Sequence, residues 1–244
     1  MRISIIHMRT RECLNEILSS ARQKIYEAAL QKPNFIALPE YFSIPGVIDK
    51  YMSAEAIYLQ TYEPTVNLLR EISKKFKDIY IVGGTIIERE GFSYYNTCTI
   101  WRNGCRLASY RKRNLIGIEE KIGLSKAESP LVLETEICKV GVLICADIFD
   151  QKAVDQTVKH GAEVIFLPVA ALHAHPHVEG HPLTERIASE KKVAIVKVGN
   201  VRSGAKGGRS AVITPWGVIS EADDSSMDAV LTVDLDLEKL RSLR

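Results

Sequence analysis

The sequence lacks an excess of charge of either sign. It carries 32 lysine and arginine residues against 30 aspartate and glutamate residues, a net charge of +2. Nucleic-acid-binding proteins usually show a clear basic excess, so this balance argues against a nucleic-acid partner. No apolar run reaches the ~18 residues of a membrane-spanning helix. The first residues also lack the apolar core and cleavage site of a signal peptide, so we expect a cytoplasmic protein with no membrane partner.

Cysteine is scarce, and the spacing of the cysteines is not typical of a metal site or of a set of disulfides. The count is odd and no CxxC pair occurs, which argues against a zinc site or a full set of disulfides. The five residues are Cys13, Cys98, Cys105, Cys138 and Cys145. Asn103-Gly104 is typical of a two-residue hairpin turn. Its register pairs Arg102 with Cys105 and places Cys98 opposite Ser109, so the hairpin does not join the two sulfurs.

Helical and strand patterns alternate along the chain, with hairpins between them. Apolar spacing predicts helices over 11–31, 64–76, 151–160 and 183–191. No repeat, low-complexity tract or linker interrupts the pattern, which predicts a single domain over 1–244. Because hairpins occur among the alternating helices and strands, we expect an α/β protein in which helices cover a sheet of parallel and antiparallel strands. The glycine-rich stretch 204–208 lacks the spacing of a phosphate-binding loop.

Three chemically reactive side chains come at the ends of predicted strands. Glu40 follows NFIALP, Lys112 follows CRLASYR, and Cys145 ends KVGVLIC. In layered α/β proteins the active site gathers at the carboxyl ends of strands. Each residue alone has a commoner explanation, as a core cysteine, a solvated turn glutamate or a surface lysine.

The order of short motifs resembles the nitrilase superfamily of carbon–nitrogen hydrolases over nearly the whole chain. The matching segments, in order, are YEAALQKPNFIALPEYF (26–42), GGTIIEREGFSYYNT (83–97), YRK (110–112), VGVLICAD (140–147), GAEVIFLPVA (161–170), HPLTERIASEKKVAIVKVGN (181–200) and GGRSAVITPWG (207–217). The resemblance implies a four-layer α-β-β-α sandwich. It also implies a homo-oligomer, a dimer or higher, formed by packing helices.

The resemblance implies roles for the three strand-end residues. Cys145 would be the nucleophile, Glu40 the general base and Lys112 the stabiliser of the oxyanion. A fourth acid often supports the lysine in this family. Its distance from Leu124 favours Glu120, with Glu119 as the alternative.

Further residues are expected around this triad. The backbone N–H of Ala146 would help to bind the oxyanion, and the pocket would include Tyr41, Phe149 and His181. Asp147 is expected to accept backbone hydrogen bonds at the turn after the nucleophile. Tyr95 and Asn96 either line the site or serve the hairpin.

The chain departs from the family pattern after the nucleophile. Relatives often carry Arg four residues after the cysteine, followed by Phe-Pro-Glu, whereas this chain reads Ala146-Asp-Ile-Phe-Asp150. Asn114 stands where many relatives have histidine. The triad is complete, but the choice of substrate stays open among a small amide, an ω-amide and a carbamoyl compound, with a nitrile less favoured. Hydrolysis would pass through a cysteine thioester and release ammonia or an amine, with no cofactor or metal.

Two other functions remain possible from the sequence. HAHPHVEGH places His173, His175, His177, Glu179 and His181 within nine residues, a tract that can bind metal. We favour a loop over the active site, because Pro176, Gly180 and Pro182 oppose a metal-binding helix. A catalytically silent binding or regulatory member of the same fold is the second alternative. A papain-like protease is not supported, because the surroundings of Cys13 supply no Cys–His pair.

Overall fold

A computed structural model describes residues 1–171, 180–202, 208–222 and 227–244. The strands are β1 (Arg2–Arg9), β2 (Phe35–Ala37), β3 (Tyr80–Glu90), β4 (Ser93–Arg102), β5 (Cys105–Arg111), β6 (Val132–Glu134), β7 (Lys139–Val142), β8 (Val164–Ala171), β9 (Ala194–Val201), β10 (Ala211–Thr214), β11 (Gly217–Glu221) and β12 (Ala229–Asp234). The helices are α1 (Leu14–Ala29), α2 (Ala54–Lys75), α3 (Gly117–Lys121), α4 (Gln151–Lys159), α5 (Pro182–Lys191) and α6 (Leu237–Ser242), with 3-10 turns η1 (Ile48–Lys50) and η2 (Cys145–Phe149). None of the described helices is both long and apolar enough to cross a bilayer.

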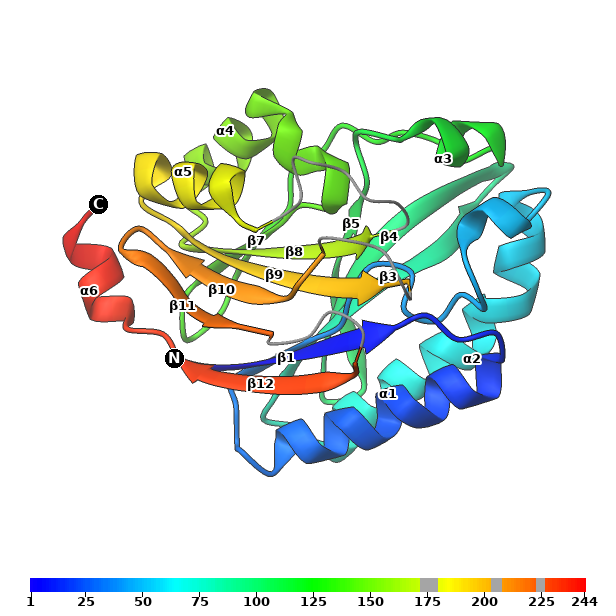
Figure 1. The fold of residues 1–244 in the computed structure, drawn as a ribbon, viewed down its shortest axis with the longest axis horizontal. Helices are drawn as coiled ribbons and strands as arrows, with labels where there is room; N and C mark the ends of the chain where they lie inside the picture. The colour runs from blue at the N-terminus through cyan, green and yellow to red at the C-terminus, as the bar shows by residue number, and fades with distance from the viewer. Residues whose placement is uncertain (172–179, 203–207, 223–226) are drawn as a thin grey trace.

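Two halves of one continuous sheet face each other between two layers of helices (Figure 1). The strand order is β5-β4-β3-β2-β1-β9-β8-β7-β6, and β1 joins the halves. Its first part pairs with β2 and β12, and Met8 and Arg9 at its end pair with β9. Helices α1 and α2 cover one half, and α4 and α5 cover the other (Figure 1). The expected four-layer sandwich is confirmed.

Apolar side chains fill the spaces between these layers. Between the halves of the sheet, the rings of Phe35 on β2 and Phe166 on β8 lie 5.4 Å apart. Parallel strands buried on both faces need nearly continuous apolar sequence, as NFIAL and EVIFL have. On the outer side, α1 buries Ile17, Ala21 and Ile25, which are four residues apart and therefore share one face.

Helix α2 begins ten residues earlier than the predicted range 64–76. Ser53 caps it, because its side chain accepts a hydrogen bond from the backbone N–H of Ala56 at 3.2 Å. Pro64, the first residue of the predicted range, lies inside the helix. Proline lacks the N–H that would bond to the carbonyl four residues earlier, at Gln60. Gln60 is exposed, so water can hydrate that carbonyl.

The β4–β5 hairpin confirms the turn and corrects its register. Asn103 and Gly104 both have positive φ, at 48° and 77°, as a tight hairpin turn requires. Arg102 pairs with Cys105 as expected. However, a bulge between Ile100 and Trp101 shifts the later pairs, so Cys98 lies opposite Tyr110 and not opposite Ser109.

Candidate active site

Cys145 lies in a tight turn and does not end a strand as expected. Strand β7 stops at Val142, and Cys145 is the first residue of η2. Its φ of +44° lies in the left-handed region, which is costly for a residue other than glycine. Such strain persists only where neighbouring contacts hold it, and it is common at active sites.

Asp147 supplies the contacts that hold this turn. One carboxylate oxygen accepts hydrogen bonds from the N–H of Ile144 at 3.0 Å and from the hydroxyl of Tyr110 at 2.8 Å. The other accepts from the N–H of Arg113 at 3.1 Å. The expected role of Asp147 as an acceptor of backbone hydrogen bonds is confirmed. It also ties the turn to the segment that carries Lys112.

Glu40 follows β2 in a loop that several polar contacts fix. The next residue, Tyr41, has a φ of +54°, and its N–H donates to the hydroxyl of Thr85 at 3.0 Å. The side-chain amide of Asn200 donates to the carbonyls of Glu40 and Tyr41 at 3.1 and 3.2 Å. The side chain of Glu40 is 1% exposed. The loop therefore presents a buried carboxylate in a fixed position.

Lys112 binds two buried carboxylates. One of them belongs to Glu119, whereas the sequence favours Glu120 as the supporting acid. Its ammonium donates to Glu40 and to Glu119, each at 2.9 Å. Glu120 is exposed and pairs with Lys126 at 2.9 Å, so the choice of Glu120 over Glu119 was wrong about which acid contacts Lys112. Successive residues of a helix point about 100° apart, and α3 turns Glu119 inward. The N–H of Ile116 fixes Glu119 by donating to it at 2.8 Å.

Asn96 and Tyr41 complete the buried network. The amide of Asn96 donates to Glu40 at 2.9 Å and lies 3.1 Å from Glu119. The hydroxyl of Tyr41 donates to Glu119 and lies 2.7 Å from the same amide. Asn96 thus faces the site. Tyr95 instead has its ring beneath the guanidinium of Arg111, at 4.1 Å from the ring centre.

Burial controls the protonation of this cluster. It raises the pKa of Glu40, although the ammonium of Lys112 opposes the rise. Burial alone would lower the pKa of Lys112, but Glu40 and the acidic groups beside it outweigh burial and raise it. Burial, followed by the charge of Glu40, raises the pKa of Cys145 to about 12. At neutral pH the cluster therefore holds a thiol, an ammonium and a carboxylate that gains a proton readily.

The other predicted pocket residues differ in their surroundings. Among the described residues, no acceptor pairs with the backbone N–H of Ala146. Phe149 is 51% exposed at the end of η2. His181 is buried, and its Nε2 lies 3.0 Å from Glu221. The members of the histidine tract at 173–179 lie outside the described residues.

Within the part of the chain that the structure describes, no three histidine, cysteine or acidic side chains form a metal site. Sequence reasoning also missed two buried polar residues of β9, Lys197 and Asn200. The signal for both was present, because each interrupts the apolar run VAIVKVGN of a strand that has both faces covered.

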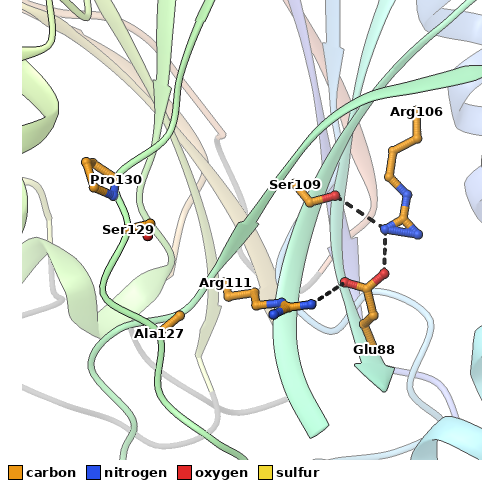
Figure 2. A pocket seen from close by; sticks show the side chains of 7 residues that line it. All are labelled: Glu88, Arg106, Ser109, Arg111, Ala127, Ser129 and Pro130. Carbon is orange, nitrogen blue, oxygen red and sulfur yellow. Dashed lines mark hydrogen bonds and ion pairs between the residues drawn. The ribbon is translucent and has the colours of Figure 1, made fainter. Parts of the chain in front are cut away.

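A separate polar pocket of about 360 Å³ lies beside β5 (Figure 2). Its lining residues are Glu88, Arg106, Ser109, Arg111, Ala127, Ser129 and Pro130. Glu88 lies between the two arginines, 2.5 Å from Arg106 and 3.9 Å from Arg111 (Figure 2). Arg111 also pairs with Glu90 at 2.6 Å. These charges already compensate one another, and no cysteine lines the pocket.

Known proteins share both this sequence pattern and this fold. Omega-amidase NIT2 of Danio rerio is 31% identical over 260 residues, which cover 100% of this chain and 91% of that protein. The crystal structure of Saccharomyces cerevisiae Nit3, a nitrilase superfamily member, has a TM-score of 0.86 at 24% identity and covers 100% of this chain and 93% of that one. An amidase from Nesterenkonia sp. AN1 has a TM-score of 0.80 at 25% identity, with coverage of 100% and 96%.

The match to a known family extends over the whole chain. The family described as carbon-nitrogen hydrolase matches residues 2–244. That span includes the turn of Cys145, the loop of Glu40 and the buried ammonium of Lys112. The protein therefore belongs to the carbon–nitrogen hydrolase family.

Proposed function

We propose that this protein is an amidase that hydrolyses a small amide through a thioester on Cys145. The observation that supports this most strongly is the buried ammonium of Lys112 held 2.9 Å from Glu40, beside the strained turn of Cys145. A base, an electrostatic stabiliser and a nucleophile are thus gathered in one buried cluster. These are the parts that nucleophilic acyl transfer requires.

The first half of the reaction forms the thioester. The thiol is protonated at rest, so Glu40 removes its proton as Sγ attacks the amide carbonyl carbon. The carbonyl π bond becomes a negative oxygen, which the ammonium of Lys112 and the N–H of Ala146 stabilise. Donors fixed in this way contribute about 3 kcal/mol each. Protonated Glu40 then gives its proton to the nitrogen, the C–N bond breaks, and ammonia or an amine leaves.

The second half of the reaction releases the acid. Glu40 takes a proton from a water molecule, and the water oxygen attacks the thioester carbonyl. The same two donors stabilise the second oxyanion. When the C–S bond breaks, the proton returns from Glu40 to Sγ, so the enzyme regains its starting state. A base must be available in both halves, and the raised pKa of Glu40 suits repeated proton transfer near neutrality.

Glu119 has a positioning role in this scheme. It binds Lys112 at 2.9 Å and is itself fixed by Ile116 and Tyr41. An ammonium with two carboxylate contacts loses freedom to leave the position that the oxyanion needs. Asn96 does the same for Glu40, by donating to its carboxylate at 2.9 Å.

The named relatives support amides as the substrate class. They include an omega-amidase at 31% identity and an amidase in which acrylamide added to the active site cysteine, at 25% identity. We extend this to ω-amides and simple small amides, with carbamoyl compounds next and nitriles last.

The test is ammonia release from purified protein across the four substrate classes. We expect turnover of at least one amide, and Cys145→Ser should lower it at least about 1,000-fold. Cys13→Ser is the matched control, because Cys13 is exposed and lies outside the cluster. Thermal unfolding of both variants should stay near that of the wild type. Turnover that survives Cys145→Ser would refute the mechanism, and no turnover at all would favour a silent binding protein.

We also propose a homodimer in the cytoplasm. The family resemblance supports dimerisation through helices. All five cysteines are free, which suits a reducing compartment. Sedimentation showing only a 27.2 kDa species at micromolar concentration would refute the dimer. Recovery of the protein in a membrane or secreted fraction after cell fractionation would refute the location.

A further inference from the structure

Lys197 is a buried cation that the proposed reaction does not use. It lies in the middle of β9, next to Leu167 of β8 and Ala211 of β10, and it is 5% exposed. Its ammonium reaches the carbonyl of Gly180 at 3.4 Å. Among the described residues, no carboxylate forms an ion pair with it. Lysine is almost never buried without a partner, so this one lacks the anion that such a position usually contains.

His181, the side chain next to Lys197, also has a polar atom without a hydrogen-bond partner among the described residues. His181 is 7% exposed, and its Nε2 lies 3.0 Å from Glu221, which also binds Arg209 at 3.1 Å. Because a carboxylate accepts, Nε2 donates, and neutral His181 then offers Nδ1 as an acceptor. That buried Nδ1 has no partner among the described residues. The ammonium of Lys197 marks a place where an anionic part of a ligand can bind, whereas Nδ1 of His181 needs a hydrogen-bond donor such as water.

Lys197 lies near the turn that carries Cys145. Its neighbour on β8, Leu167, follows Phe166, whose carbonyl accepts from the N–H of Leu143, two residues before Cys145. The charged groups that act on it are Cys145, Glu221 and Arg209. Those that act on Glu40 are Lys112, Glu119 and Cys145. Cys145 is common to both sets, so it lies within electrostatic reach of both Lys197 and Glu40. Asn200, which fixes the Glu40 loop, is three residues further along β9, or about 10 Å at the rise of a strand.

We propose that Lys197 binds a carboxylate at the end of the substrate remote from the scissile amide, so that the preferred substrates are monoamides of short dicarboxylic acids. The inference rests on the proposed function and names the residue that selects the substrate. The segment from Ala146 to Asp150 carries no cation, so none of its side chains can form an ion pair with a substrate carboxylate. With the amide carbon at Sγ, the oxyanion faces Lys112 and the carboxylate faces Lys197.

The alternative role for Lys197 is to stabilise the thiolate of Cys145. The two roles differ in a measurable way. A cation that acts on the thiolate would speed the hydrolysis of charged and neutral amides by the same factor. A cation that binds a substrate carboxylate would favour only the charged amide.

The experiment compares two amides of the same shape in wild-type protein and in Lys197→Met. The monoamide of butanedioic acid carries a carboxylate, and 4-methylpentanamide has an uncharged isopropyl group in its place. We expect the wild type to prefer the acid, and Lys197→Met to lower that preference in kcat/KM at least about 30-fold, mainly through KM. Lys159→Met, on the exposed surface of α4, is the control and should change the preference less than about twofold. An equal fall for both amides, or no preference in the wild type, would overturn the inference.

A binding measurement separates failure of this inference from failure of the proposed function. Calorimetry with Cys145→Ser should detect binding of the same monoamide, and adding Lys197→Met should abolish it. If no amide is hydrolysed but this binding depends on Lys197, the carboxylate subsite is supported and the proposed amidase function is refuted. If turnover depends on Cys145 but neither binding nor the preference for the charged amide depends on Lys197, the amidase function is supported and the carboxylate subsite is refuted.

Discussion

At the scale of single residues, Lys112 is the point on which the polar network converges. Its ammonium binds Glu40 and Glu119, while neighbouring Glu120 points to solvent. Two adjacent glutamates therefore form a matched pair. Glu119→Gln should lower kcat roughly 10- to 100-fold, because it loosens the position of Lys112. Glu120→Gln should leave kcat near the wild-type value.

The pH profile distinguishes this positioning role from a purely structural one. The charge of Glu119 contributes to the raised pKa of Glu40. Removing that charge lowers the pKa of Glu40, so its carboxylate stays ionised to lower pH. The acidic limb of kcat/KM should therefore move to lower pH in Glu119→Gln and stay in place in Glu120→Gln. Equal kcat values and equal limbs in the two variants would contradict the role.

It was predictable from sequence that Glu40, Lys112 and Cys145 lie close together, but their individual contacts were not predictable. Glu40, Lys112 and Cys145 were found because each interrupts or follows an apolar strand within a matching motif. The choice between Glu119 and Glu120 depends on the rotation of a five-residue helix, which has too few residues for a periodic pattern. Lys197 interrupts an apolar run, but only the structure shows that its side chain is buried.

At the scale of elements, a bulge in β3 sets the position of the Glu40 loop. The pairing of β3 with β4 shifts between Val82 and Thr85. Gly84, with a φ of +58°, lies at this shift, and a Cβ there would be 2.2 Å from the carbonyl oxygen of Pro39. The carbonyl of Pro39 also accepts from the N–H of Thr85 at 3.3 Å. The absent side chain thus lets β3 and the residue before Glu40 approach closely.

Gly84 and Gly91 allow this contact to be tested. Gly91 has almost the same φ, +59°, but no atom lies within 4 Å of an added Cβ. Gly91→Ala should cost about 1 kcal/mol of unfolding free energy for the left-handed backbone alone. Gly84→Ala adds the clash and should cost about 3 kcal/mol or more, and it should lower kcat by displacing Glu40. Denaturant unfolding and ammonia release measure the two effects. Similar losses in both variants would show that the close approach does not matter.

The approximate positions of helices and strands were predictable from apolar spacing, but the residues at which they begin and end were not. The β4–β5 hairpin turn was predictable because Asn103-Gly104 fits only a few turn geometries. The start of α2 was missed because Pro64 resembles a helix start, and packing against β3 outweighs the lost hydrogen bond. The bulge at Ile100 was missed because it follows from twist and packing between strands, and no single residue signals it.

At the scale of the whole molecule, the layers were predictable and the site geometry was not. Alternating helices and strands with inserted hairpins allow few arrangements, and the family resemblance reduced these to one. The site, however, joins residues from four separate segments, at positions 40, 96, 112–119 and 145. Such distant contacts depend on the register of every strand between them. A one-residue shift in a strand turns each side chain to the other face.

The five free cysteines allow a test of the whole arrangement by alkylation. Cys98 and Cys138 are buried, and burial raises the pKa of Cys138 to about 12. Cys13 and Cys105 are exposed, so access alone would make them label first with iodoacetamide. Cys145 is only partly exposed, and its own pKa of about 12 leaves little thiolate at neutral pH. With Glu40 as the proposed base, labelling of Cys145 should therefore depend on Glu40.

We expect iodoacetamide, itself a small amide, to label Cys145 faster than Cys13 and Cys105, with loss of activity in proportion to that labelling alone. In Glu40→Gln, labelling of Cys145 should slow by about 100-fold, the usual contribution of a general base. The rates at Cys13 and Cys105 serve as internal controls, because neither contacts Glu40. A substrate amide should protect Cys145 and spare no other site. Peptide mapping by mass spectrometry measures all five rates in one sample. Inactivation that follows Cys13, or a rate at Cys145 that ignores Glu40→Gln, would show that the nucleophile or its base has been wrongly assigned.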